Sequence, residues 1–218
     1  MQLNFMTFNL RVHVLEDGDN AWPNRINEVA EAIKQAQADI VCTQEGLPSM
    51  LQDLQALLPE YQSIGASRSS GTPDECCARM CTWAKFSSLE GKEWIVYNTH
   101  LDHVSEEARQ NGIQLILSKM NPSKSLIPSM LTGDFNCEPS SKVIELIHEA
   151  GLISAFSFLE EPLSRTYHGF QGGDTGSPID YIYMSEDARI SSSTIDRSLY
   201  NGRYPSDHYP ITTTVILD

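Results

Sequence analysis

Six segments of this sequence place polar side chains where a strand-like apolar run meets a loop. In chain order they are Thr7-Phe8-Asn9-Leu10, Thr43-Gln44-Glu45, Asn98-Thr99-His100-Leu101-Asp102-His103, Gly133-Asp134-Phe135-Asn136, Ile179-Asp180-Tyr181-Ile182 and Ser206-Asp207-His208. One such residue alone usually indicates a solvated strand end, a turn or a structural histidine. Six on successive elements favour a shared site, because open sheets bind ligands at strand ends and loops on a rigid scaffold carry function.

Apolar periodicity predicts alternating strands and helices early in the chain and mostly strands late. Strands are predicted at 3–10, 39–43, 94–99, 128–132, 179–184, 190–197 and 211–217. Helices are predicted at about 23–37, at 50–58, after an N-cap at Ser105, and from Pro139 to a C′ residue at Gly151. Residues 11–20 are predicted to form a loop. This order suits mixed sheets with helices packed outside them.

Length and charge narrow the class of protein. At 218 residues, one domain covering 1–218 is the default, with a core that needs no disulfide or structural metal. The net charge of −14 argues against a broad basic nucleic-acid surface and against attraction to anionic membranes. A phosphate substrate stays compatible with this charge, because a bound divalent cation reverses the local field.

Cysteine usage and the start of the chain favour a cytoplasmic protein. The five cysteines form no evident disulfide framework, which is typical of reduced thiols. Cys76, Cys77 and Cys81 lack a spaced partner pair, so we expect no zinc site. The first residues show no signal-peptide pattern, and no run approaches the 18 or so apolar residues of a membrane span. We therefore expect no membrane insertion.

The polar residue types fit magnesium-assisted hydrolysis of a phosphate ester. Mg²⁺ prefers oxygen ligands and keeps several waters, so one or two carboxylates and an amide oxygen suffice. Glu45, Asp207 and Asn9 offer those oxygens. Hydrolysis also needs an activated water, neutralisation of the phosphoryl charge and protonation of the leaving oxygen.

A histidine–carboxylate pair can supply the proton transfer. His208 with Asp180 is the candidate pair, because a carboxylate fixes the tautomer of an imidazole and stabilises its protonated form. Asp134 and Asn136 lie two residues apart on a predicted turn, where both can reach a nucleophilic water or a phosphate oxygen.

Taken in this order, the six segments resemble the endonuclease/exonuclease/phosphatase family, which has the deoxyribonuclease I-like fold. The motifs Gly-Asp-Phe-Asn at 133–136 and Ser-Asp-His-x-Pro at 206–210 are specific in combination, and the likeness covers most of the chain. Three further stretches resemble a bacterial branch of the family: Trp22 with Arg25, Cys81-Thr82-Trp83-Ala84, and Thr166-Tyr167-His168-Gly169-Phe170.

The resemblance implies an α/β (α+β) fold, a four-layer α/β/β/α sandwich of two mixed β-sheets flanked by helices. It implies a divalent-metal hydrolase that uses Mg²⁺, with Mn²⁺ as an alternative ion. Glu45 would be the principal metal ligand, with Asn9 and Asp207 nearby. Residues 64–81 depart from the family pattern, because a strand pair with a Gly-Glu and an aromatic-rich strand is expected there. Either this hairpin is short in the protein or the sequence lacks part of it.

The same resemblance implies roles in the reaction. His208, oriented by Asp180, would act as general base or phosphate contact. Asp134 would position or activate the water, and Asn136 would stabilise charge. His100 would contact the phosphate or assist the leaving group. The identity of the base stays open among His100, Asp134 and His208.

The substrate also stays open at this point. It is a phosphodiester or phosphomonoester in a small molecule such as a sugar, lipid headgroup or nucleotide, or it is DNA or RNA. A nucleic acid normally requires a groove lined by Lys and Arg, and the chain has only 15 of these residues. His103, His168 and Arg11 are candidate substrate contacts. Structural hydrogen bonds are the alternative for the histidines, and a surface role is the alternative for the arginines, Arg25 included.

Two other hypotheses compete with an active enzyme. A non-catalytic binding module on the same fold predicts that at least one core polar residue is replaced, and none is. An unrelated α/β protein that uses these residues in turns and caps would not explain their ordered set. The sequence does not predict an oligomeric state or the number of metal ions.

Overall fold

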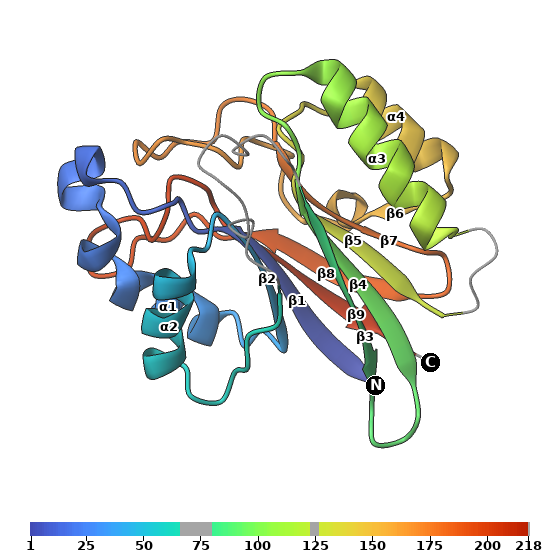
Figure 1. The fold of residues 1–218 in the computed structure, drawn as a ribbon, viewed down its shortest axis with the longest axis horizontal. Coiled ribbons are helices and arrows are strands. Elements are labelled where there is room, and N and C mark those ends of the chain that lie inside the picture. Colours follow the sequence, from blue (N-terminus) through green and yellow to red (C-terminus); the bar gives the residue numbers. More distant parts are fainter. Residues whose placement is uncertain (66–79, 123–126, 218) are drawn as a thin grey trace.

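Two β-sheets lie face to face in the computed structural model, which describes residues 1–65, 80–122 and 127–217 (Figure 1). The first sheet has the order β2-β1-β9-β8, with β1 (Gln2–Asn9), β2 (Ile40–Gln44), β8 (Arg189–Ile195) and β9 (Ile211–Ile216). The second has the order β3-β4-β5-β7-β6, with β3 (Cys81–Ser87), β4 (Glu93–His100), β5 (Ser129–Asp134), β6 (Ile153–Ser154) and β7 (Asp180–Met184).

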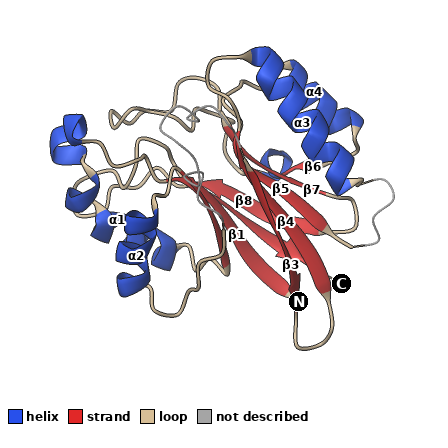
Figure 2. Cartoon of the chain, viewed as in Figure 1, coloured by secondary structure: helices blue, strands red, loops and turns tan. Residues whose placement is uncertain are grey.

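Helices cover the outer face of each sheet. The pair α1 (Ile26–Gln35) and α2 (Pro48–Leu57) lies outside the first sheet, and the pair α3 (Glu106–Met120) and α4 (Lys142–Glu149) lies outside the second (Figure 2). Short 3₁₀ helices are η1 (Leu15–Asn20), η2 (Trp22–Asn24) and η4 (Ala155–Phe158). The predicted four-layer sandwich of two mixed sheets is confirmed.

Three apolar clusters hold the four layers together. One fills the space between the sheets, with Phe5, Val96, Met130, Ile182 and Ile211 among its members. The other two bury the apolar faces of the helix pairs against the sheets. One includes Phe8, Val29, Ile33, Met50 and Leu54, and the other includes Ile113, Ile116, Val143, Ile147 and Tyr183. Each sheet therefore buries both faces, which fixes its strand ends relative to those of the other sheet.

Strand direction brings the functional strand ends to one edge of the sandwich. β1 pairs with β2 in parallel, so Asn9 lies beside Gln44. β4 pairs with β5 in parallel, so His100 lies beside Asp134, and β7 runs antiparallel so that its first residue, Asp180, also meets Asp134. The sequence order of these residues thus becomes a spatial cluster.

Several element boundaries differ from the sequence prediction. The first helix begins at Ile26 and not at 23, because η2 occupies the turn around Pro23. The helix predicted to open at Pro139 begins at Lys142, where the Ser141 hydroxyl accepts a hydrogen bond from Ile144 N–H and caps it. The predicted loop 11–20 contains η1. Strands β3 and β6 were not predicted.

Two sequence predictions concern residues that the structure leaves undescribed. The departure from the family pattern at 64–81 falls mostly on 66–79, which lie outside the described residues, as do Cys76 and Cys77 of the cysteine cluster. Cys81, Cys42 and Cys137 are free thiols. Within the described ranges, none of the helices has the length and apolarity needed to span a bilayer.

Candidate active site

Asp134 lies at the centre of the polar cluster. Its Oδ2 accepts a hydrogen bond from Asn9 Nδ2 at 3.0 Å and lies 3.4 Å from His100 Nε2 and 3.9 Å from His208 Nε2. The residue is 2% exposed. Asn136 stabilises the turn that follows Asp134. Its backbone N–H donates to Asp134 Oδ1 at 2.9 Å, and its side-chain amide donates to Leu101 O at 3.0 Å. Residues from both sheets thus meet at one carboxylate.

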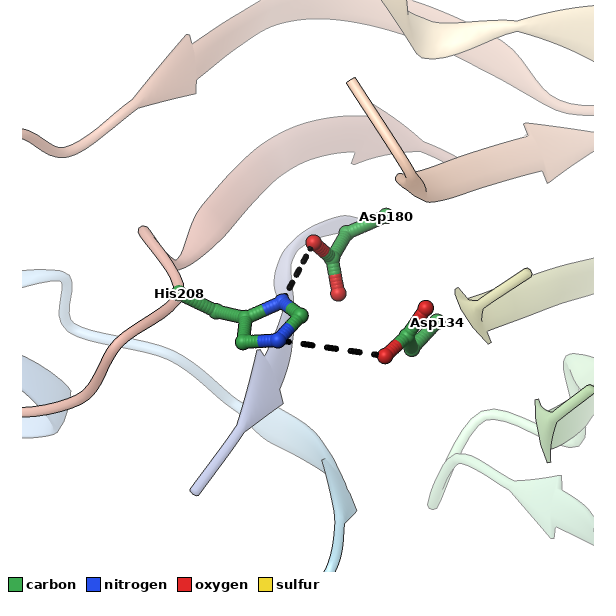
Figure 3. A group of neighbouring side chains, drawn as sticks. All are labelled: Asp134, Asp180 and His208. Atoms are coloured by element: carbon green, nitrogen blue, oxygen red, sulfur yellow. Dashed lines mark hydrogen bonds and ion pairs between the residues drawn. The ribbon is translucent and has the colours of Figure 1, made fainter. Parts of the chain in front are cut away.

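His208 and Asp180 form the predicted pair. His208 Nδ1 donates to Asp180 Oδ2 at 2.8 Å, and both side chains are buried (Figure 3). The other ring nitrogen, Nε2, points toward Asp134, as the dashed line in Figure 3 shows. One carboxylate therefore orients the imidazole, and the opposite nitrogen faces the second carboxylate.

Glu45 lies in a second region of the site, beyond the end of β2. Its Oε2 accepts the backbone N–H of Val12 at 2.7 Å, and its Oε1 lies 3.3 Å from Asn9 Nδ2. Asn9 is shared between this region and Asp134. The Asn9 amide therefore fixes the spacing between the two carboxylates.

Asp207 and Arg11 complete this second region. Arg11 Nε lies 3.8 Å from Asp207 Oδ2, and the guanidinium donates two hydrogen bonds of 2.9 Å to Asp17 on η1. The Ser206 hydroxyl donates to Asn9 O at 2.6 Å and so ties the segment before Asp207 to the end of β1. Arg11 places a partly exposed cation at the rim of the acidic centre.

The backbone takes unusual conformations at three positions of the site. Arg11, Glu45 and Asn136 have φ values of 54°, 62° and 50°, a region that non-glycine residues rarely occupy. Such strain clusters at functional sites, where surrounding contacts fix it. Gly133 has φ 139°, and a Cβ there would lie 1.8 Å from Thr99 O, so only glycine lets β5 approach β4 ahead of Asp134.

The environments of the two central carboxylates shift their acidity in opposite directions. Burial, followed by the negative charge of Asp180, raises the pKa of Asp134 to about 7. Burial alone would also raise the pKa of Glu45, but hydrogen bonds from Val12 N–H and the Asn9 amide outweigh it, and the net pKa is lowered. Glu45 is therefore an anion at neutral pH, whereas Asp134 can hold or release a proton.

The carboxylates around His208 favour the protonated, cationic form of its imidazole. Burial lowers its pKa, but the carboxylates of Asp180, Asp134 and Asp207 outweigh burial and raise it to about 10. The imidazole is protonated at neutral pH. This state suits a phosphate contact better than a general base, the two roles that the sequence left open.

The remaining candidate residues are spread around the site. His103 is exposed on the loop before α3. His168 is 4% exposed, and its ring stacks on Tyr209 with a centroid distance of 3.9 Å while Nδ1 accepts Gly172 N–H. Burial also lowers its pKa to about 4. These contacts indicate a packing role for His168, the alternative to a substrate contact.

Three features near the site were not predicted from the sequence: a link between the sheets at Gln44, a ring contact of Tyr167 and the burial of Arg25. Gln44 Nε2 donates to Asn98 Oδ1 at 2.8 Å, and Asn98 Nδ2 donates to Thr43 O at 2.8 Å, which links the two sheets. Tyr167, half exposed, lies with its ring 5.0 Å from that of His208. Arg25 is fully buried, so its expected surface role is wrong. A polar residue inside an apolar strand was the available signal for Gln44.

Two sets of side chains offer metal ligands among the described residues. Asp134, Asp180 and His208 present ligand atoms within 4.8 Å of one another. Glu45 and Asp207 present carboxylate oxygens, which Mg²⁺ prefers. Asn9 would add its Oδ1, which accepts the Arg11 N–H in this structure, while its Nδ2 faces Glu45 and Asp134. Burial and then the negative charge of Glu45 raise the pKa of Asp207, against the opposing charges of His208 and Arg11. A dication between these two carboxylates would remove that repulsion, so the oxygen set fits the ion.

Two packed sheets that gather carboxylates, amides and imidazoles at one edge define a class of phosphoester hydrolases. The chain belongs to the endonuclease/exonuclease/phosphatase family, whose sequence profile matches residues 6–208. Members of this family are hydrolases that act on phosphoester bonds. The family and fold inferred from the six segments are therefore confirmed.

Similar proteins share the fold over the whole chain. A family protein from Bacteroides thetaiotaomicron is 25% identical, with a TM-score of 0.90 over 100% of this chain and 98% of that chain. A mannosyl-6-phosphatase from Bacteroides thetaiotaomicron VPI-5482 is 23% identical, with a TM-score of 0.88 over 99% of this chain and 100% of that chain.

A sequence relative matches a shorter part of the chain. Nocturnin from Rattus norvegicus is 28% identical over 135 residues, 55% of this chain and 32% of Nocturnin. The chain thus matches about a third of that relative's length.

Proposed function

We propose that this protein is a single-domain hydrolase of phosphodiesters or phosphomonoesters that requires Mg²⁺ or Mn²⁺. The observation that carries the proposal is the contrast within one site. An anionic Glu45 lies beside a buried group in which His208 is protonated and the pKa of Asp134 is raised to about 7, and the Asn9 amide contacts both Glu45 and Asp134. An ester hydrolase needs both kinds of group, because charge must be neutralised while protons move.

Glu45, Asn9 and Asp207 would hold the ion. When bound, the ion supplies charge neutralisation at the phosphoryl oxygens and makes an attacking water more acidic. Asp134, Asp180 and His208 serve another role, because His208 is protonated and its Nδ1–H is already donated to Asp180. A protonated imidazole is a poor metal ligand.

The protein's own groups move the proton and bind the phosphate. Asp134 accepts a proton from the attacking water, since a pKa of about 7 matches a neutral operating pH. His208, oriented by Asp180, donates its Nε2–H to a phosphoryl oxygen. His100 contacts the phosphate or assists the leaving oxygen from the end of β4, and the leaving oxygen takes up the proton that Asp134 releases. Asn136 fixes the turn and offers its second amide hydrogen to developing charge.

A small phosphorylated molecule is the preferred substrate over DNA or RNA. The net charge of −14 disfavours a long polyanion, because affinity for nucleic acid depends on many Lys and Arg contacts. Among the described residues, the rim of the site instead offers the guanidinium of Arg11, the exposed His103 and the half-exposed ring of Tyr167.

The test is turnover of bis-p-nitrophenyl phosphate and p-nitrophenyl phosphate with Mg²⁺, Mn²⁺ or EDTA. We expect metal-dependent turnover that is lost in His208→Ala and retained in His148→Ala, an exposed histidine on α4. The preferred compound then separates diester from monoester chemistry, and a fluorescent oligonucleotide tests the nuclease alternative. Binding of Mg²⁺ and of phosphate without turnover of any of these substrates would favour the non-catalytic binding module.

A further inference from the structure

Arg25 is the largest of the fully buried side chains in the described structure, with 0% exposure. It immediately precedes α1. No ion pair found across residues 1–65, 80–122 and 127–217 joins it to a carboxylate. A buried cation is costly unless its hydrogens are satisfied, so its contacts indicate why the fold retains it.

Backbone carbonyls satisfy the guanidinium. Nε donates to Asn20 O at 2.8 Å, Nη1 donates to Leu10 O at 2.6 Å and to Pro205 O at 2.9 Å, and Nη2 donates to Arg11 O at 2.5 Å. The rings of Trp22 and Phe170 lie 5.2 and 5.7 Å from its central carbon. A planar group with five donors in a fixed fork can make these bonds together, and an ammonium cannot.

Three of the four carbonyls, those of Leu10, Arg11 and Pro205, belong to the two segments that carry the proposed metal ligands. Leu10 and Arg11 directly follow Asn9, and Pro205 lies two residues before Asp207. Besides the pairing of β1 with β9, a second contact joins the same segments, the hydrogen bond from the Ser206 hydroxyl to Asn9 O. Arg25 therefore lies behind the site and contacts both segments at once.

We propose that Arg25 is a positioning residue that sets the spacing between Asn9 and Asp207 by binding the backbone of both segments. The part of this inference that is tested by Mg²⁺ affinity rests on the proposed function. Arg25 touches no ligand atom, and it acts through the carbonyls of its neighbours. Side chains that orient metal ligands typically contribute about 10–100-fold to metal affinity or activity.

The test compares Arg25→Lys with Arg203→Lys. Arg203 is the control because its exposed side chain also donates to backbone carbonyls, Asp19 O and Asn24 O, but to none of the carbonyls of Leu10, Arg11 and Pro205 that Arg25 binds. In Arg25→Lys we expect Mg²⁺ affinity by calorimetry to fall about 10–100-fold and kcat to fall with little change in KM. Arg203→Lys should match the wild type in both.

Hydrogen exchange gives a readout that does not depend on the activity. The N–H groups of Arg11 and Val12 donate to Asn9 Oδ1 and Glu45 Oε2, so their protection reports the geometry of this segment. Arg25→Lys should lose protection there while the amides of α3 stay protected. Unchanged protection would overturn the inference. Wild type that binds no Mg²⁺ would instead count against the proposed function, and the exchange comparison would still decide the role of Arg25.

If Arg25→Lys fails to fold, Ser206→Ala provides a second test of the same spacing. It removes the hydrogen bond from the Ser206 hydroxyl to Asn9 O between the same segments, together with the longer contacts of that hydroxyl with Asp207 Oδ1 at 3.3 Å and with the His208 N–H at 3.4 Å. If the spacing of these segments matters, Ser206→Ala should weaken Mg²⁺ binding in the same direction and lower protection at Arg11. A folded Ser206→Ala with wild-type Mg²⁺ affinity and protection, beside an unfolded Arg25→Lys, would leave Arg25 with a purely structural role and would refute the proposal.

Discussion

Glu45 and Asp134 are both carboxylates bound by the Asn9 amide, yet they belong to different environments. Glu45 follows a strand of the first sheet, is half-buried and receives a backbone N–H from Val12. Asp134 ends a strand of the second sheet, is 2% exposed and lies near the negative charge of Asp180. The first environment lowers the carboxyl pKa and the second raises it to about 7.

The difference shows how one site can hold a cation and move a proton with the same residue type. Hydrogen-bond donors keep one carboxylate charged, while burial and a like charge make the other a proton carrier. The sandwich makes this possible because each sheet supplies one environment. Exchanging the two roles would require moving the donors, and a substitution at either residue should therefore produce a distinct defect.

Asp134→Asn should give the largest loss of turnover. The amide cannot accept a proton, and a lost general base costs about 10²–10⁴-fold in kcat. The affinity for Mg²⁺ should stay within about threefold of the wild type by calorimetry, because Asp134 is assigned to the proton and not to the ion. Asp187→Asn, an exposed turn residue, is the control and should behave as wild type. A collapse of Mg²⁺ affinity in Asp134→Asn would move Asp134 into the metal site.

Glu45→Gln should produce the complementary defect. We expect the Mg²⁺ affinity to fall by more than about 100-fold, because even a residue that only orients a ligand contributes about 10–100-fold. Part of the activity should return at high Mg²⁺ concentration, which would not happen in Asp134→Asn. Glu31→Gln, an exposed glutamate on α1, serves as the matched control. Retention of wild-type Mg²⁺ affinity in Glu45→Gln would refute the ligand assignment.

The sequence predicted the fold and the position of the site because both depend on local patterns. Apolar periodicity marks strands and helices, and parallel pairing then brings their ends together, as it does for His100 and Asp134. The Ser105 N-cap was correctly placed, since capping is a local hydrogen bond, here from Ala108 N–H. Six strand ends in one order were enough to predict a common edge.

What the sequence could not predict depends on contacts between distant segments. Nothing local distinguishes the environment of Glu45 from that of Asp134, because Val12, Asn9 and Asp180 reach them only in the fold. Arg25 resembled a surface arginine for the same reason, since its carbonyl partners include Pro205, 180 residues away. β3 was missed because it lies at the edge of its sheet and none of its residues is buried, so its sequence lacks a continuous apolar run.

The smallest expected effect concerns stability in EDTA, and here the two substitutions should differ in sign. The pKa of Asp134 is raised in the folded state, so folding favours its protonated form and stability falls as pH rises from about 4 to 7. Asp134→Asn mimics that neutral form and should melt above the wild type at pH 8. The gain is several °C, since about 1 kcal/mol moves Tm by about 2–4 °C for a chain of this size. Near pH 4 the gain should vanish.

Glu45→Gln should melt below the wild type at pH 8. The pKa of Glu45 is lowered in the folded state, so its stabilising contribution is present above the unfolded value near 4.5 and is lost as pH falls through the folded value. The melting temperature of Glu45→Gln should therefore rise toward that of the wild type as the solution is acidified. The melting temperature of Asp134→Asn should instead fall toward that of the wild type. Scanning calorimetry from about pH 2.5 to 8 measures both curves, because the Glu45 contribution is lost below the unfolded value near 4.5. Two curves of the same sign would mean that Glu45 and Asp134 share one environment, and the division of the site into an ion-holding and a proton-holding carboxylate would fail.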